Sequence, residues 1–196
     1  MRIKVSGFLA GAAMVALAGC ANAPRQGNLT GEYLAGRFAA RVNAFEDAAD
    51  AYADAAAVAP GAESIVGRAF AYHLAIGDIE TAASFAARLA PVDDETGGGA
   101  GLTRVTLTAK AMKAGAYGKV KTELARGGTA GFLEPAAFLM GAWAEAAANG
   151  PEAGLQRLDH PGSDFVRAFV PMHRALLAEQ AGREEEARGA YQTSVL

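Results

Sequence analysis

The sequence is poor in the residues that build disulfides and metal sites. Its 196 residues include a single cysteine, Cys20, one tryptophan and three histidines. One cysteine excludes a disulfide within the chain. The histidines His73, His160 and His173 neither adjoin a glutamate nor form a His-x-x-x-His pair, which argues against zinc. We therefore expect no metal site, and a fold held together by packing.

Positive charge is also scarce. The chain has 18 lysines and arginines against 21 acidic residues, and Arg2 and Lys4 lie within the first 19 residues. Without that segment the balance is 16 against 21, a net charge of about −5. Binding to nucleic acid requires a basic stripe that neutralises phosphates. We therefore expect no nucleic-acid partner.

Signatures of catalysis are absent as well. The glycine-rich run Gly97–Gly101 lacks the lysine and the hydroxyl residue of a phosphate-binding loop, and no strand pattern precedes it. No Gly-x-Ser-x-Gly elbow occurs. The acidic run Glu184–Glu186 fits the first turn of a helix, where the helix dipole favours negative charge. We expect neither a cofactor nor an enzyme activity, and we expect His73 on a helix surface or in a groove.

The N-terminus has the composition of an export signal. Two basic residues precede an apolar run from Val5 to Ala16, which is shorter than the roughly 20 residues of a spanning helix. Leu-Ala-Gly then stands directly before Cys20 and resembles the lipobox of bacterial lipoproteins. The resemblance implies that residues 1–19 are removed, that the Cys20 sulfur carries a diacylglyceryl group, and that residues 20–28 form a tether. The alternative is a signal cut at an Ala-x-Ala-like site, with Cys20 unmodified and the protein soluble in the periplasm.

Five turn signals divide the rest of the chain at a period near 34 residues. They begin, in steps of 34, 38, 35 and 32 residues, at Asn43, Gly77, Gly115, Gly150 and Gly182. Glycine suits the left-handed residue that follows a helix. Asp78 can cap the helix after it, and Pro151 suits a first helical turn. Helix starts are also indicated at Thr30, at Glu134-Pro135 and at Ser163.

Apolar and small residues recur at helical spacing on both sides of each signal, which predicts a pair of helices around every turn. Before the turns the faces are Leu34, Phe38, Val42; Ile65, Ala69, Tyr72, Ile76; Leu102, Val105, Ala109, Met112; Leu139, Trp143, Ala146; and Phe165, Phe169, Met172, Leu176. After the turns they are Ala48, Tyr52, Ala55, Ala59; Ile79, Ala82, Ala86, Leu89; Val120, Leu124; Leu155, Leu158; and Ala187, Tyr191. No segment has a strand pattern.

This arrangement resembles the tetratricopeptide repeat (TPR). The match in the first unit comprises Gly36, Ala48, Tyr52, Ala55 and Pro60, and in the fifth Ala175, Gly182, Ala187, Tyr191 and Ser194. The third and fourth units depart from it, with Val120 and Leu155 in the small-residue place. The resemblance implies that the small residues lie where the two helices of a unit touch, and that the aromatic fills the gap beside them.

The expected fold is an all-α, TPR-like solenoid of helical hairpins that follows a lipoprotein signal peptide. It has about five units, near residues 29–60, 62–92, 101–127, 135–160 and 163–196. Residues 93–101 are expected to form a flexible insertion between the second and third units. The last unit stops at Leu196, before its second helix should finish, and nothing caps Tyr191 and Val195. We expect the natural chain to be longer, or its C-terminal edge to be paired.

The resemblance implies a lipid-anchored scaffold that binds an envelope protein or peptide in a concave groove lined by the first helices. The candidate groove residues are Tyr33, Arg37, Arg41, His73, Lys113 and Glu179. Arg37 and Arg41 stand four residues apart and can grip a carboxylate or acidic peptide together. In the lipoproteins that the N-terminus resembles, an aspartate directly after the cysteine retains the protein in the inner membrane. This chain has Ala21 there, so the resemblance implies an anchor in the outer membrane, facing the periplasm. The alternatives are an outer-membrane or pilus assembly factor, and the N-terminal TPR part of a longer envelope protein whose activity lies downstream.

Overall fold

The computed structural model describes residues 28–90 and 98–194, and these form eleven α-helices and one 3-10 turn, with no strand among them. The expected all-α class is confirmed. The signal segment, Cys20, most of the tether, the acidic residues of the expected insertion and Leu196 lie outside the described residues.

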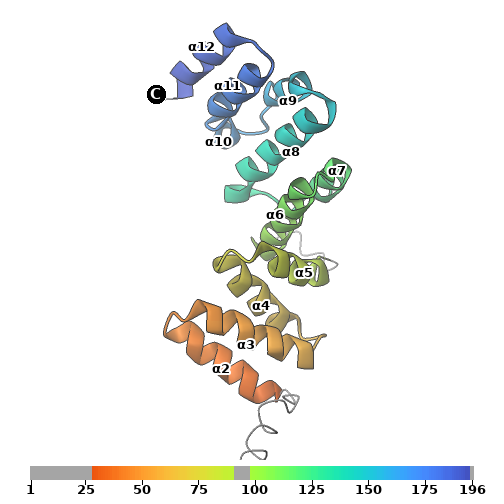
Figure 1. Cartoon of the computed structure of the whole chain (residues 1–196), viewed down its shortest axis with the longest axis vertical. Coiled ribbons are helices and arrows are strands. Elements are labelled where there is room, and N and C mark those ends of the chain that lie inside the picture. Colours follow the sequence, from red (N-terminus) through yellow and green to blue (C-terminus); the bar gives the residue numbers. More distant parts are fainter. Residues whose placement is uncertain (1–27, 91–97, 195–196) are drawn as a thin grey trace, which may run out of the picture.

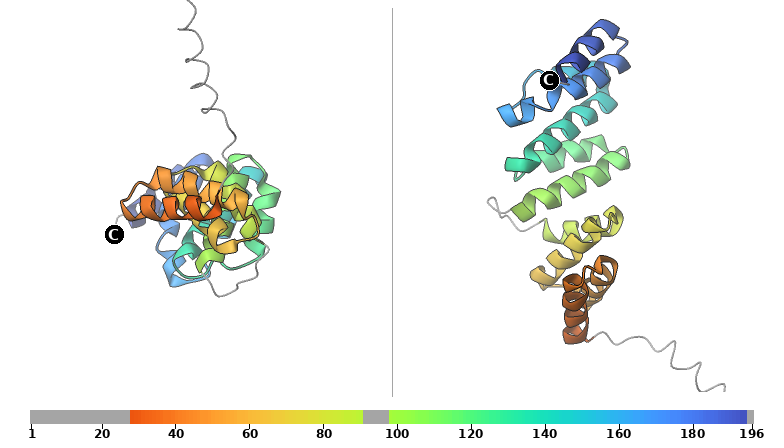
Figure 2. Two further views of the ribbon diagram at one scale, coloured as in Figure 1. Left: turned by 90° about the horizontal axis from the view of Figure 1, so that it is seen from below. Right: turned by 90° about the vertical axis from the view of Figure 1, so that its left-hand side faces the viewer.

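The helices form hairpins in the expected order. Their bounds are α2 (Leu29–Arg41), α3 (Phe45–Val58), α4 (Glu63–Ala75), α5 (Ile79–Leu89), α6 (Gly98–Lys113), α7 (Tyr117–Ala125), the 3-10 turn η1 (Gly131–Leu133), α8 (Glu134–Asn149), α9 (Pro151–Leu158), α10 (Asp164–Arg167), α11 (Val170–Gln180) and α12 (Glu184–Ser194). Each helix packs on its hairpin partner, and each second helix packs on the first helix of the next unit. The hairpins therefore stack into an elongated array, with α2 and α12 at opposite ends (Figures 1 and 2).

The turns are built as their sequences indicate. The backbone φ is 80° at Gly77, 68° at Gly115, 97° at Gly150 and 72° at Gly182, all in the left-handed region that glycine adopts without strain. In the first hairpin Asn43 takes this place with φ 60°. A carboxylate oxygen of Asp78 accepts a hydrogen bond from the backbone N–H of Thr81 (3.1 Å), which caps α5. Pro151 lies in the first turn of α9.

Of the three helix starts that the sequence indicates, Glu134-Pro135 and Ser163 are confirmed, as the start of α8 and the cap of α10, whereas Thr30 is wrong. Asn28, rather than Thr30, caps α2, since its side-chain oxygen accepts from the backbone N–H of Thr30 (3.1 Å). Gly98 to Gly101, expected in a flexible insertion, form the first turn of α6. A side chain at Gly101 would collide with the backbone of the next loop, because its Cβ would lie 2.4 Å from the carbonyl oxygen of Gly128. Glycine is required here by close packing of α6 against that loop.

The single helical face expected over Phe165, Phe169, Met172 and Leu176 is wrong. Ser163 caps the short α10, and the chain leaves helical structure before α11 starts. Pro171 supplies a physical reason, because it has no N–H to continue the hydrogen-bond ladder back into α10. The buried residues here are instead Val166, Val170, Ala175, Leu177 and Ala178. Phe165, Phe169 and Met172 are exposed.

Small residues bring the helices of the first unit together around one aromatic ring. A Cβ at Gly36 would lie 3.1 Å from the ring of Tyr52, which is fully buried. Tyr33 meets that ring edge-on (centroids 5.9 Å apart) and Tyr72 stacks on it (5.4 Å). The small-residue contact expected from the TPR resemblance is therefore present. The three tyrosines join α2, α3 and α4 into one core with the surrounding alanines.

The third unit is the most polar part of the core. Thr103, Arg104, Thr106 and Thr108 of α6 are buried, whereas the expected face of Leu102, Val105, Ala109 and Met112 is half-buried throughout. The reason is that α6 packs against α5, α7 and α8, so that it is covered on several sides. Threonine suits such a helix because its hydroxyl can bond the preceding turn, as Thr106 does with the carbonyl of Leu102 (2.9 Å).

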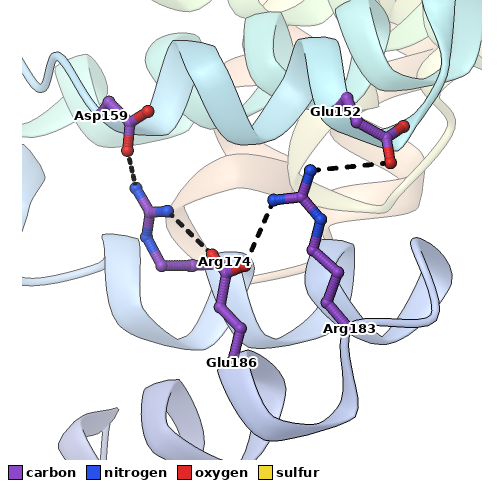
Figure 3. Close-up of polar contacts among 5 residues, drawn as sticks. All are labelled: Glu152, Asp159, Arg174, Arg183 and Glu186. Carbon is purple, nitrogen blue, oxygen red and sulfur yellow. Dashed lines mark hydrogen bonds and ion pairs between the residues drawn. The ribbon is translucent and has the colours of Figure 1, made fainter.

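A five-residue ionic network ties the last two units together (Figure 3). Arg174 of α11 bonds Asp159, at the end of α9, and Glu186 of α12 (3.3 Å). Arg183 bonds Glu186 (3.3 Å) and lies 3.8 Å from Glu152 at the start of α9. Arg174 is half-buried, so its charge is less screened than that of an exposed residue. The network thus spans three helices.

We expect the substitution Arg174→Met to lower the free energy of unfolding by about 1–2 kcal/mol, because it removes a half-buried guanidinium that pairs with both the exposed Asp159 and the half-buried Glu186. Urea unfolding followed by circular dichroism measures this. The matched control is Arg167→Met, which removes only an exposed pair with Asp164 within α10, and should cost less than about 0.5 kcal/mol. Equal losses in both variants would show that the network adds nothing beyond isolated surface pairs.

Candidate functional site

The described residues hold no obvious catalytic centre. Nowhere in residues 28–90 and 98–194 do three or more His, Cys, Asp or Glu side chains gather where they could hold a metal ion. Within the same ranges, no helix is both long and apolar enough to cross a membrane. Three other features stand out: two exposed apolar patches, and a hydrogen-bonded pair of tryptophan and histidine.

Trp143 and His173 join two first helices, α8 and α11. The indole N–H of Trp143 donates a hydrogen bond to Nδ1 of His173 (2.9 Å), with the rings edge-to-face and their centroids 6.2 Å apart. Burial lowers the pKa of His173 below its usual value. Nδ1 can accept this bond only while the imidazole is neutral. The pair therefore couples the packing of α8 on α11 to the protonation state of His173.

Acidification should disturb this pair. A histidine with a lowered folded pKa contributes stability that is fully present above its unfolded pKa of about 6.5, and that is lost as the pH falls through the folded value. Because Trp143 is the single tryptophan, its fluorescence reports the contact directly. We expect constant emission from pH 8 to 7 and a change with a midpoint below about 6.5. His173→Gln, which can still accept the bond, should abolish the transition; its persistence would assign it to another group.

The C-terminal apolar patch consists of Phe165, Phe169 and Met172. All three side chains are exposed, and the two phenylalanine rings meet edge-to-face with centroids 5.7 Å apart. They belong to α10, its end and the start of α11, and Met172 immediately precedes His173. Aromatic residues and methionine are enriched in protein interfaces. The patch therefore has the composition of a protein-binding surface.

The α2 stripe consists of Leu34, Phe38 and Val42. These residues were predicted to form one face of a helix, and that face is on the outside, because they are 55%, 70% and 55% exposed. Gly36 and Ala39 on the opposite face are buried instead. The reason is that α2 packs mainly on α3, through small residues that accommodate Tyr52. Its larger apolar residues are left on the outside.

Two of the candidate groove residues lie beside the α2 stripe. Arg37 and Arg41 are exposed, and no ion pair joins either to another described residue. The Arg37 guanidinium lies over the ring of Tyr33, 6.0 Å from its centroid. Tyr33 itself is half-buried against Tyr52 and so presents only part of its ring to solvent. Arg37 and Arg41 thus have the exposure that a binding role needs.

The structure corrects the expectation for His73, which is only 6% exposed and cannot line a groove. Its Nδ1 lies 3.2 Å from a carboxylate oxygen of Asp78, and its ring stacks on Phe85 (centroids 5.6 Å apart). Hydrogen bonds from Thr81, together with His73, lower the pKa of Asp78. His73 therefore belongs to the packing of the α4–α5 turn.

The other two candidate groove residues bind neighbours within the chain. Lys113 lies 3.5 Å from a carboxylate oxygen of Glu80, which also pairs with Lys110 (3.3 Å), so that α5 is tied to α6. Glu179 accepts a hydrogen bond from the hydroxyl of Tyr191 (2.9 Å), which raises the pKa of that tyrosine. The structure thus does not gather the candidate residues into one site.

A cavity of about 440 Å³ opens between α7, α8 and α9. Lys121, Glu145 and Arg157 line it, together with apolar residues. Arg157 crosses α8 at Gly141, where a Cβ would lie 2.7 Å from its guanidinium, and it covers the ring of Phe138 at 5.5 Å. The glycine therefore makes room for the arginine at this point.

The sequence did not predict the exposure of the α2 stripe, the C-terminal apolar patch or the pairing of Trp143 with His173. The pair is 30 residues apart, close to one repeat, so the repeat period was a usable signal for it. The two patches had no such signal, because their spacing is the same as that of a buried helix face.

Comparison with known proteins supports the fold. No protein-family model matches the chain, and no curated protein sequence does. Among solved structures, the chain is similar to the crystal structure of MamA protein, a TPR-containing protein, with a TM-score of 0.64 over 85% of this chain and 90% of that one. The sequences are 13% identical, so the likeness concerns the fold alone. The protein has a TPR-like fold of stacked helical hairpins.

Proposed function

We propose that the protein is a lipid-anchored scaffold of the bacterial envelope, held at the periplasmic face of the outer membrane through Cys20, and that its repeat array binds another envelope protein or peptide. TPR-like arrays present a long surface rather than a pocket, which suits binding rather than catalysis. The observation that carries the proposal is the C-terminal apolar patch, because three exposed apolar side chains within eight residues, at the junction of α10 and α11, mark an interaction surface.

The partner that fits this patch is an amphipathic helix. Phe165, Phe169 and Met172 are uncharged, exposed side chains at the junction of α10 and α11. The neighbouring arginines are paired within the chain, Arg167 with Asp164 and Arg174 with Asp159 and Glu186. An incoming helix would therefore bind through apolar anchors at its own i, i+3 and i+4 positions.

The test is photo-crosslinking in intact cells. A photoreactive residue in place of Met172 should capture an envelope protein, whereas the same residue in place of the exposed Arg188 of α12 should not. Phe165→Ser with Phe169→Ser should abolish capture without reducing helix content, because both side chains are exposed. Capture that survives this double substitution would place the binding surface elsewhere. The lipid anchor is tested separately by mass spectrometry of the intact protein, in which the wild type should carry the mass of the acyl chains and Cys20→Ser should not.

A further inference from the structure

The stripe on α2 differs from the C-terminal patch in its charge and in its place in the chain. Leu34, Phe38 and Val42 are exposed in succession along one side of a 13-residue helix. Arg37 and Arg41 are exposed along the edge of the same side, since they follow Leu34 and Phe38 by three residues and so lie beside them on the helix surface. The one acidic residue of α2, Glu32, is half-buried. The exposed side of α2 is therefore apolar and basic, with no exposed carboxylate.

This composition is that of a helix that lies in a membrane interface. Such helices bury large apolar side chains at the level of the acyl chains, while arginines reach along the edge to the phosphates. A groove for an acidic peptide would require the arginines to be central and the apolar residues to be covered by the fold. On α2 the largest apolar side chain, Phe38, is 70% exposed and stands between the two other apolar residues.

The position of α2 in the chain points the same way. Only eight residues separate Cys20 from Leu29, the first residue of α2. At 3.3–3.6 Å per residue, they span about 30 Å at most. A lipid on Cys20 would therefore keep α2 within that distance of the bilayer surface. Since α2 forms one end of the array (Figure 1), it can approach the bilayer without the rest of the array in between.

We propose that α2 docks on the phospholipid surface through Leu34, Phe38 and Val42, with Arg37 and Arg41 bound to anionic headgroups. This inference rests on the lipid anchor of the proposed function and adds to it a second membrane contact. The acyl chains on Cys20 would hold the protein at the bilayer without fixing its orientation, and a second contact through α2 sets that orientation. The docked surface ends after Val42, because the exposed carboxylates of Glu46 and Asp47 begin α3.

The experiment uses the protein as cells process it, purified and reconstituted in vesicles of phosphatidylethanolamine with phosphatidylglycerol. Because Cys20 is the sole cysteine, an introduced cysteine gives a defined site for an environment-sensitive fluorophore. Ala35→Cys places the label on the exposed side of α2 and leaves the stripe intact, whereas Gln192→Cys places it on α12 at the far end of the array. Blue-shifted emission and quenching by lipid-bound quenchers are expected at position 35 and not at position 192.

Two further variants separate the apolar and electrostatic parts. Leu34→Gln with Phe38→Gln should return the label at position 35 to aqueous emission, with no loss of helix content because both residues are exposed. Arg37→Gln with Arg41→Gln should shift the emission at position 35 toward the aqueous value on anionic vesicles but leave it unchanged on phosphatidylcholine vesicles. High salt should reproduce the second effect.

The outcomes distinguish this inference from the function on which it rests. Aqueous emission at position 35 in acylated, vesicle-bound protein overturns the docking of α2 and leaves the anchor standing. An intact mass without acyl chains overturns the anchor. Cys20→Ser then keeps position 35 as the one labelled thiol, and its emission reports whether α2 enters added anionic vesicles. If the emission at position 35 is aqueous and the Leu34→Gln, Phe38→Gln variant no longer crosslinks a protein that the wild type does, the stripe binds a protein partner instead. Concentration-dependent dimers that the same variant abolishes would assign it to a second copy of this chain.

Discussion

Replacing Tyr52 by alanine should lower the free energy of unfolding of the N-terminal hairpins by about 3–5 kcal/mol. The side chain is fully buried, and it contacts Tyr33, Gly36 and Tyr72 on two other helices. Removing the ring leaves a cavity that three helices border, and the rigid backbones around it cannot close it completely. Urea unfolding followed by circular dichroism measures the loss.

Tyr52→Phe is the matched control. Burial raises the pKa of Tyr52, although the nearby guanidinium of Arg68 opposes this. No group among the described residues is placed to form a well-aligned hydrogen bond with the buried hydroxyl. Removing an unbonded hydroxyl while keeping the ring should leave the stability within about 1 kcal/mol of the wild type. A loss in Tyr52→Phe as large as that in Tyr52→Ala would mean that the hydroxyl, rather than the ring, stabilises the unit.

The same experiment tests how far the effect travels. Stability in a repeat array is a sum of units and of contacts between neighbours. Trp143 lies in α8, in a core cluster separate from that of Tyr52. In Tyr52→Ala we therefore expect circular dichroism to change at lower urea than the fluorescence of Trp143. Coincident transitions would show that the array unfolds as a single unit.

Replacing Gly154 by alanine should destabilise the fourth unit, by roughly 1–3 kcal/mol. A Cβ at this position would lie 2.8 Å from Cβ of Ala146, 2.8 Å from a methyl carbon of Leu177 and 2.9 Å from the carbonyl oxygen of Ala142. One of these neighbours is backbone and another is a Cβ, so neither can move away as the end of a flexible side chain can. The crowding should therefore exceed the gain in helix propensity.

Gly189→Ala provides the opposite result as a control. Gly189 lies within α12, and nothing would lie within 4 Å of its added Cβ. Alanine is preferred to glycine in a helix interior by about 1 kcal/mol. We expect this variant to be more stable by about 0.5–1 kcal/mol, as measured by thermal or urea unfolding. Destabilisation by both substitutions would contradict the assignment of close helix packing to Gly154.

Much of the fold could be predicted from the sequence, because its signals are local. The left-handed glycines at Gly77, Gly115, Gly150 and Gly182, the cap at Asp78 and the helical period depend on residues a few positions away. The contact of Gly36 with Tyr52 was predictable too, because the spacing of small and aromatic residues resembles a known repeat. These features established five hairpins in order and the all-α class.

What only the tertiary structure decided is which side of each helix is covered. The Leu34, Phe38 and Val42 face has the same spacing as a buried face, yet it is exposed, because Gly36 and Ala39 allow α2 to pack through its small side. His73 is buried and Trp143 is paired with His173 because of neighbours 12 or more residues away along the chain. Helical periodicity shows that a helix has two sides, but burial depends on which neighbours pack on it. The candidate binding surfaces lie on helix sides that no other described helix covers, so they could be identified only from the positions of the helices in space.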